Sequence, residues 1–186
     1  MAEAEKKAAR ERRTTVFIDE AAFYLLPGVV KTYAPRGETP ILRGVLTRDH
    51  WSVMSGITPQ GHLFTLRRDY PLTSWESILF LCHLRRKIGT ALLAIWDGAP
   101  IHRSAEMQTF LAQGGTTFVH LEHLPPYAPD LNPDEGVWQQ LKNVALRNVW
   151  CEDLSHLSSA LTLALRRLRR KPEIIQSFFA EAGLDL

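Results

Sequence analysis

The stretch "TALLAIWDG", residues 90–98, is an almost unbroken apolar run that is closed by Asp97 and Gly98. An apolar run this short is typical of a strand that is buried on both faces. Such strands occur in the parallel part of a sheet that helices cover on both sides. The stretch therefore predicts a central parallel strand that ends in an aspartate.

A second apolar segment, "TTVFID" (14–19), also ends in an acid, Asp19. "ILRGVLT" (41–47) and "HWSVMSGITPQGHLFTL" (50–66) follow it, and "TPQG" predicts a hairpin turn between two strands. The order is thus three strands first, then strands that alternate with helices. This order predicts an α/β fold with a mixed sheet and helices on its faces.

The helices are predicted from apolar periodicity and from their stop signals. In the first of them Trp75, Ile78, Leu79 and Cys82 form one stripe, which we expect to face the core. The predicted helices are 74–88, 102–115, 132–148 and 153–171, with a strand at 117–125 and a short helix after Pro172.

Two predicted strands end in aspartates, Asp19 and Asp97. If these strands lie side by side and parallel, their carboxylates meet at one edge of the sheet. Open α/β sheets place their sites at this edge. The two aspartates are therefore candidate site residues, although each can also be a turn or cap residue.

The stretch "LPPYAPDLNPDEGVW" (124–138) holds three more acids, Asp130, Asp134 and Glu135. Asn132 as N-cap, followed by Pro133 and two acids, is a good helix start that needs no active site, with Asp134 as a first-turn helix stabiliser. Helical phase predicts a buried side formed by Val137, Trp138, Leu141, Val144 and Ala145. It puts Asp134 near the centre of this side and Glu135 on its flank. This phase mildly favours Glu135 as a ligand at a cleft margin, and Asp130 has the weakest claim.

Carboxylates that converge in this way are suited to binding Mg²⁺, which prefers hard oxygen ligands and keeps several waters. Two such ions about 4 Å apart can activate a nucleophile and stabilise the leaving oxygen of a phosphodiester. On spacing alone, structural roles for the acids fit equally well. The chain has no phosphate-binding glycine loop and no G-x-S-x-G motif. "HLEH" (120–123) is a weak candidate for a zinc site, because its side chains would point to two different faces of a strand.

The 186 residues carry a net charge of only +2, but the basic residues are concentrated near the C-terminus. Between Gln139 and Lys171 there are seven Lys and Arg residues against two acids, which suits a polyanionic partner or a solvated helix face. The two cysteines form no disulfide or zinc pattern, and neither a signal peptide nor a membrane span is recognisable. We expect a cytoplasmic protein with a charged lead (1–13) and one domain (14–186).

The segments "FIDEAAF", "WDGAPIH" and "LPPYAPDLNPDEGVWQQLK" resemble the catalytic domain of DDE transposases. The likeness is greatest to the bacterial insertion-sequence branch of the mariner-like superfamily, and "YAPRGETPILRG" (33–44) shares it. The resemblance implies a ribonuclease H-like fold. It also implies that Asp19, Asp97 and Glu135 are catalytic and bind two Mg²⁺ or Mn²⁺ ions.

Three features depart from the family's pattern. Gly98 stands where Asn is usual, and Tyr33 replaces a common Trp. The family's N-terminal helix-turn-helix region is absent, so a separate N-terminal DNA-binding polypeptide is one possible partner. The resemblance further implies a homodimer, because related transposases pair two DNA ends.

The function expected from this resemblance is metal-dependent DNA cleavage and strand transfer at insertion-sequence ends. The alternatives are a ribonuclease H-fold nuclease without strand transfer and an inactive remnant that only binds DNA or a partner. The expected partners are transposon-end and target DNA and no membrane. The candidate DNA-contacting residues are His102, Lys142, Arg166, Arg167, Arg169 and Arg170.

Overall fold

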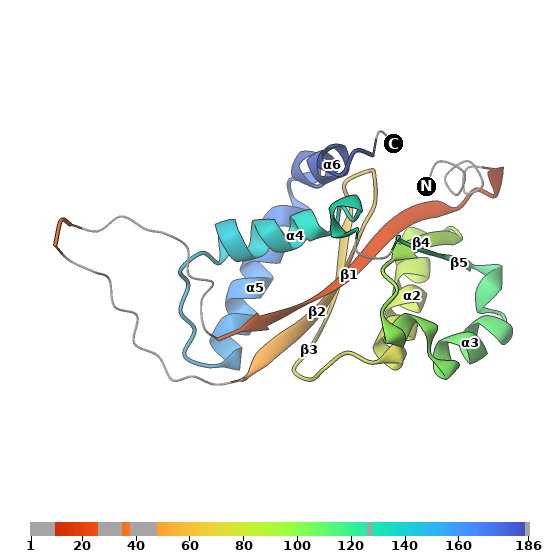
Figure 1. Ribbon diagram of the computed structural model, residues 1–186, viewed down its shortest axis with the longest axis horizontal. Helices are drawn as coiled ribbons and strands as arrows, with labels where there is room; N and C mark the ends of the chain where they lie inside the picture. Colours follow the sequence, from red (N-terminus) through yellow and green to blue (C-terminus); the bar gives the residue numbers. More distant parts are fainter. Residues whose placement is uncertain (1–9, 26–34, 38–47, 126–127, 185–186) are drawn as a thin grey trace.

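The computed structural model describes residues 10–25, 35–37, 48–125 and 128–184. Its centre is a five-stranded sheet in the order β3-β2-β1-β4-β5 (Figure 1). β1 pairs with β2, and β2 with β3, in antiparallel fashion, whereas β4 is parallel to both β1 and β5. The predicted mixed sheet is therefore confirmed. Its strands are β1 (Thr14–Tyr24), β2 (His50–Ile57), β3 (Leu63–Arg68), β4 (Leu92–Trp96) and β5 (Val119–His123).

The strand β1 is longer than its sequence predicts. The prediction ended at Asp19, but the ladder with β2 continues to Tyr24, which lies opposite His50. The added residues include two alanines and a glutamate, which have little strand propensity. Pairing with β2 along the whole length overrides this local preference.

The parallel pairing of β1 and β4 decides where Asp19 and Asp97 lie. Phe17 lies opposite Ile95 in the register of these strands. Asp19 and Asp97 each follow two residues later, so both come to the same edge of the sheet. The predicted neighbourhood of the two strands is confirmed.

Helices cover both faces of the sheet and form two separate cores (Figure 1). On one face α2 (Ser74–Ile88) and α3 (Ala105–Ala112) pack on side chains such as Ile18 and Trp96. On the other face lie α4, α5 and α6, which pack on Phe17 and Ile95. The bounds on this face are α4 (Glu135–Gln139), a π-helix (Gln140–Ala145), α5 (Leu154–Arg169) and α6 (Pro172–Glu181).

The helix α2 has the predicted bounds but not the predicted buried stripe. Ile78 is buried, whereas Trp75 and Leu79 are 64% and 51% exposed and Cys82 is exposed as well. The buried side of α2 is completed by Leu81 and Leu84 instead. Apolar residues occur on more than one side of this helix, so periodicity alone chose the wrong arc.

The helix predicted at 132–148 begins later and changes its geometry. It starts at Glu135, and from Gln140 to Ala145 it is a π-helix. A π-helix has wider turns than an α-helix, so the angular positions drift from those of a regular helix. Val144, predicted to be buried, is therefore 62% exposed.

Some expectations concern residues outside the described ranges. These are the strand "ILRGVLT" (41–47), most of the charged lead and most of "YAPRGETPILRG" (33–44). In the part of the chain that the structure describes, no helix combines the length and apolar character that crossing a bilayer requires.

The turn between β2 and β3 predicts a substitution that weakens the fold. Gly61 has a φ of 83°, and a Cβ there would lie 2.6 Å from the carbonyl oxygen of Pro172 at the start of α6. We expect Gly61→Ala to lower the free energy of unfolding by about 2–4 kcal/mol, from backbone strain and from this overlap. Urea unfolding monitored by circular dichroism measures the change.

Gly89 is the matched control, because it has a φ of 86° but no heavy atom within 4 Å of the position that a Cβ would take. Gly89→Ala should cost only the strain, about 1–2 kcal/mol. Equal losses in the two variants would show that the hairpin does not press on α6.

Candidate functional site

Three acids from distant parts of the chain line one cavity at the edge of the sheet. The cavity has a volume of about 370 Å³, and Asp19, Asp97 and Glu135 are among the residues that line it. The other described residues around it are apolar or uncharged and include no lysine or arginine. The geometry thus brings together the three acids selected from the sequence, in a cavity whose described lining carries no positive side chain.

Asp19 is the most perturbed carboxyl of the three. It lies on β1, and the indole Nε1–H of Trp138 donates to its Oδ2 at 2.9 Å. Burial raises the pKa of Asp19 to about 7, and the charges of Glu135 and Glu20 add to the rise, while the hydrogen bond from Trp138 opposes it. The raised pKa thus reflects a carboxyl that is taken out of water and lies close to other acids.

Asp97 follows β4 and is held from two directions. Its Oδ1 accepts the backbone N–H of Ala99 at 2.9 Å. The same oxygen lies 3.1 Å from Nδ1 of His102. The side chain remains 55% exposed, so it is oriented by the protein but still open to the cavity.

Glu135 is positioned by a tight turn before α4. The side-chain oxygen of Asn132 accepts the N–H of Asp134 at 3.2 Å, but the N-cap of α4 is Asp134 and not Asn132 as predicted. After Glu135 comes Gly136, where an added Cβ would lie 2.5 Å from the ring of Phe178. α6 therefore packs directly against the backbone that carries Glu135.

Asp134 does not have the role that the sequence predicted. We expected a first-turn helix stabiliser, but its side chain makes no capping hydrogen bond and is fully buried. Its Oδ1 accepts the hydroxyl of Ser55 on β2 at 2.6 Å, and its Oδ2 is buried with no partner. Burial and the neighbouring Asp19 raise the pKa of Asp134 well above its usual range. It is a buried acid between helix and sheet.

His102 was a candidate for DNA contact, and its environment contradicts that role. Its side chain is fully buried, and Nε2 lies 2.9 Å from Oε1 of Glu20. Burial alone would lower the pKa of His102, but the hydrogen bond and charge of Glu20 outweigh it and raise the pKa. Sequence reasoning did not select Glu20. Strand alternation puts its side chain on the opposite face of β1 from Asp19, and only the fold shows that His102 lies on that face.

The side chains of the remaining candidate DNA-contacting residues differ in whether they form hydrogen bonds within the protein. Arg169 is bound to the protein itself: its Nε donates to the carbonyl of Leu63 and its Nη2 donates to Thr65. This explains why it is a poor candidate for DNA contact. The ammonium group of Lys142 lies over the ring of Phe23. Exposed side chains without such bonds to the sheet are those of Lys142, Arg166, Arg167 and Arg170.

Gly98, which stands where DDE transposases usually have Asn, lies beside an arginine side chain. The guanidinium of Arg103 lies 4.0 Å from the position that a Cβ at Gly98 would take. Arg103 is exposed, and Gly98 itself lines the carboxylate cavity. A positive group thus stands next to the cavity, which sequence reasoning did not single out.

The donor set of the cavity fits a hard divalent cation. Asp19, Asp97 and Glu135 offer carboxylate oxygens, the ligands that Mg²⁺ and Mn²⁺ prefer. Burial, with the nearby charge of Glu135, raises the pKa of Asp19, and a bound cation would favour its ionised form. The arrangement is therefore chemically suited to metal-assisted reactions of phosphodiesters.

Comparison with protein families identifies one match that covers most of the chain. The model of the DDE superfamily endonucleases matches residues 14–158. A comparison with curated protein sequences finds no significant match.

Solved structures with a similar fold include several of the Mos1 transposase. The Mos1 mariner paired end complex with Mn has 18% identity and a TM-score of 0.62, and covers 97% of this chain and 60% of that one. The catalytic domain of Mos1 mariner transposase has 14% identity and a TM-score of 0.56, with coverages of 98% and 91%. The simian T-cell lymphotropic virus intasome has 16% identity and a TM-score of 0.56, with coverages of 82% and 47%. The likeness shows that the chain has the ribonuclease H-like fold expected from its sequence.

The two acids with raised pKa values make the stability of the metal-free protein depend on pH. Asp19 and Asp134 hold protons in the folded state above the pH at which an unfolded chain releases them. Their contribution to the free energy of unfolding is therefore largest near pH 4 and falls as pH rises toward 7, by up to about 1.4 kcal/mol per pH unit for each proton.

Asp134→Asn keeps an acceptor for Ser55 and removes one of these protons. We expect the variant to gain stability over the wild type at pH 8 in EDTA, with a gain that shrinks toward pH 4. Urea unfolding at several pH values measures the difference. If the unfolding free energies of the wild type and Asp134→Asn change with pH in the same way, Asp134 is ionised in the folded protein.

Proposed function

The chain belongs to the DDE superfamily endonucleases, and from this membership we propose that it is the catalytic domain of an insertion-sequence transposase. In this proposal it cuts DNA at the ends of the element and transfers the freed 3′ ends to target DNA. The chain spans about 60% of the length of the Mos1 transposase chains in the first matches. The proposal therefore concerns the catalytic part of such a system.

The observation that carries the proposal is the cavity shared by Asp19, Asp97 and Glu135. The strand β1, the residue after β4 and the start of α4 contribute these carboxylates, although they are far apart in sequence. Similar structures give support as well, since they include Mos1 paired-end complexes with Mn and with Mg and a Mos1 strand transfer complex. We assign the three acids as metal ligands and catalytic residues.

The metal in this assignment is Mg²⁺ or Mn²⁺, with two ions held by Asp19, Asp97 and Glu135. When bound, such ions activate water or a 3′-OH and stabilise the leaving oxygen of a phosphodiester. The carboxylates must be ionised to act as ligands, so Asp19 has to release its proton first. No covalent bond between protein and DNA is required.

The protein's own part in the reaction is to orient groups and to neutralise charge. Trp138 holds one oxygen of Asp19, and the N–H of Ala99 holds one oxygen of Asp97. Ligands that are oriented before the substrate binds need little rearrangement during the reaction. Arg103 next to the cavity and Lys142 on the α4 side are suited to phosphate contacts, which position DNA without reading its sequence.

The partners in this proposal are transposon-end and target DNA. Arg166, Arg167 and Arg170 on and just after α5 add exposed positive charge for a polyanion. The chain would act as a homodimer, with a separate N-terminal DNA-binding polypeptide or domain to recognise the ends. Its place of action would be the cytoplasm, at the nucleoid.

The assignment predicts which acids DNA cleavage requires. We expect the wild type to nick a supercoiled plasmid in Mn²⁺, and Asp19→Asn, Asp97→Asn and Glu135→Gln each to abolish nicking. The loss should exceed the about 10–100-fold effect of a residue that only supports a ligand. Gel electrophoresis of the plasmid forms measures the rate.

Asp130→Asn is the matched control, because Asp130 lies in the same segment but does not line the carboxylate cavity. It should cut like the wild type. Cutting that survives Asp19→Asn would disprove the assignment. Cutting without any joining of ends would favour a nuclease, and salt-sensitive binding without cutting would favour a DNA-binding remnant.

A further inference from the structure

A buried imidazole connects two acids that come from different parts of the sheet. His102 lies in the short 3-10 helix Pro100–Arg103, and its side chain has no exposed surface. Its ring is stacked on Trp96, with centroids 3.9 Å apart and planes 2° from parallel. The stack fixes the plane of the ring and so fixes the directions in which its nitrogens point.

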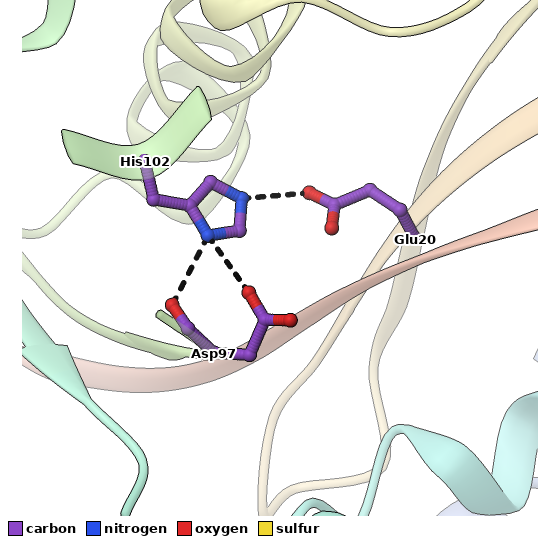
Figure 2. A group of neighbouring side chains, drawn as sticks. All are labelled: Glu20, Asp97 and His102. Carbon is purple, nitrogen blue, oxygen red and sulfur yellow. Dashed lines mark hydrogen bonds and ion pairs between the residues drawn. The ribbon is translucent and has the colours of Figure 1, made fainter. Parts of the chain in front are cut away.

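Both ring nitrogens of His102 have acidic neighbours (Figure 2). Nε2 lies 2.9 Å from Oε1 of Glu20. Nδ1 lies 3.1 Å from the backbone carbonyl of Asp97 and 3.1 Å from the Oδ1 of the same residue. A backbone carbonyl can only accept, so Nδ1 carries a proton and donates it toward Asp97.

The two acids differ in what they can do. Asp97 lines the carboxylate cavity, whereas Glu20 is absent from its lining and lies on the other face of β1 from Asp19. Glu20 nevertheless shares a strand with Asp19, as the residue that follows it. The imidazole therefore links the strand that carries one cavity acid to the loop that carries another.

We propose that the Glu20–His102 pair is a positioning device that fixes the Asp97 carboxylate relative to Asp19. The proposal rests on the proposed function, in which both aspartates bind the same metal ions. Glu20 orients the ring through Nε2, and the ring then holds Oδ1 of Asp97 together with the N–H of Ala99. Partners that orient ligands in this way are a general feature of metal sites.

The alternative is that Glu20, Asp97 and His102 together bind a metal ion. Ligand atoms of Glu20, Asp97 and His102 all lie within 4.8 Å of one another. Hydrogen bonds already account for these short distances, because each nitrogen faces an oxygen at 2.9 or 3.1 Å. The positioning role is therefore the one that the geometry favours, and the ion becomes an outcome of the test.

The test uses the full chain and Mn²⁺ titrations by calorimetry without DNA. His102→Phe keeps a ring for the stack on Trp96 and removes both nitrogens. Glu20→Gln keeps an acceptor for Nε2, and Glu20→Ala removes it. Glu122→Gln is the matched control, since Glu122 forms a comparable pair with His120 at 3.4 Å on β5 but does not line the cavity.

We expect His102→Phe and Glu20→Ala to weaken Mn²⁺ binding about 10–100-fold without changing the number of ions bound. Glu20→Gln should recover part of this loss, and Glu122→Gln should bind like the wild type. Nitrogen-15 spectra of labelled histidine add a signature that packing alone would not produce. The Nε2 signal of His102 should move in Glu20→Gln and stay in place in Glu122→Gln.

Three results would overturn the proposal. Unchanged Mn²⁺ affinity in a folded His102→Phe would leave the ring with a packing role only. Loss of one whole ion in Glu20→Ala, with the other bound as before, would make the cluster a metal site. An unmoved Nε2 signal in Glu20→Gln would show that the pair does not form.

Failure of the proposed function has a different result. In that case Asp19→Asn would bind Mn²⁺ like the wild type, or neither protein would bind it, and the positioning proposal would fall with the metal site. If Asp19→Asn abolishes binding while His102→Phe leaves it unchanged, only the positioning proposal fails.

Discussion

Two hydrogen bonds hold the start of helix α4 against the sheet, and the carboxylate cavity depends on both. Asp134 accepts the hydroxyl of Ser55 on β2, and one turn later Trp138 donates to Asp19 on β1. Ser55 and Asp19 lie directly opposite each other in the ladder of these two strands. The helix is thus fixed at the point of the sheet where Asp19 lies, and Glu135, between the two anchoring residues, must enter the same cavity.

Packing from the far side completes this arrangement. α6 lies beyond residues 14–158, which the family model matches, yet its Phe178 fills the space that a side chain at Gly136 would take. The neighbouring Phe179 meets Phe17 of β1 edge to face, with ring centroids 5.5 Å apart. The C-terminal helix therefore joins the core to the segment that carries Glu135, and a glycine after that acid is a consequence of close helix packing.

The charges of the site are balanced differently on the two faces of the sheet. On the α4 face Asp19 and Asp134 have raised pKa values, because burial and neighbouring acids disfavour their charged forms. On the α2 face Glu20 has an imidazole as its partner. Among the described residues, Asp19 and Asp134 have no such basic partner, whereas Asp97 shares the imidazole of His102 with Glu20. A site of this kind trades stability of the empty protein for affinity toward a cation.

The sequence by itself determined the mixed sheet, the two parallel strands that bring Asp19 and Asp97 together, and the segment that supplies Glu135. Local apolar runs and turn residues carry that information, and the likeness to DDE transposases favours Glu135 among the three acids of 124–138. Only the tertiary structure decided that Asp134 is buried against Ser55, that His102 faces Glu20, and that Trp75 and Leu79 are exposed. The first two outcomes depend on partners that are 79 and 82 residues away in the chain. The third depends on which side of α2 the sheet covers, and periodicity within one segment contains neither kind of information.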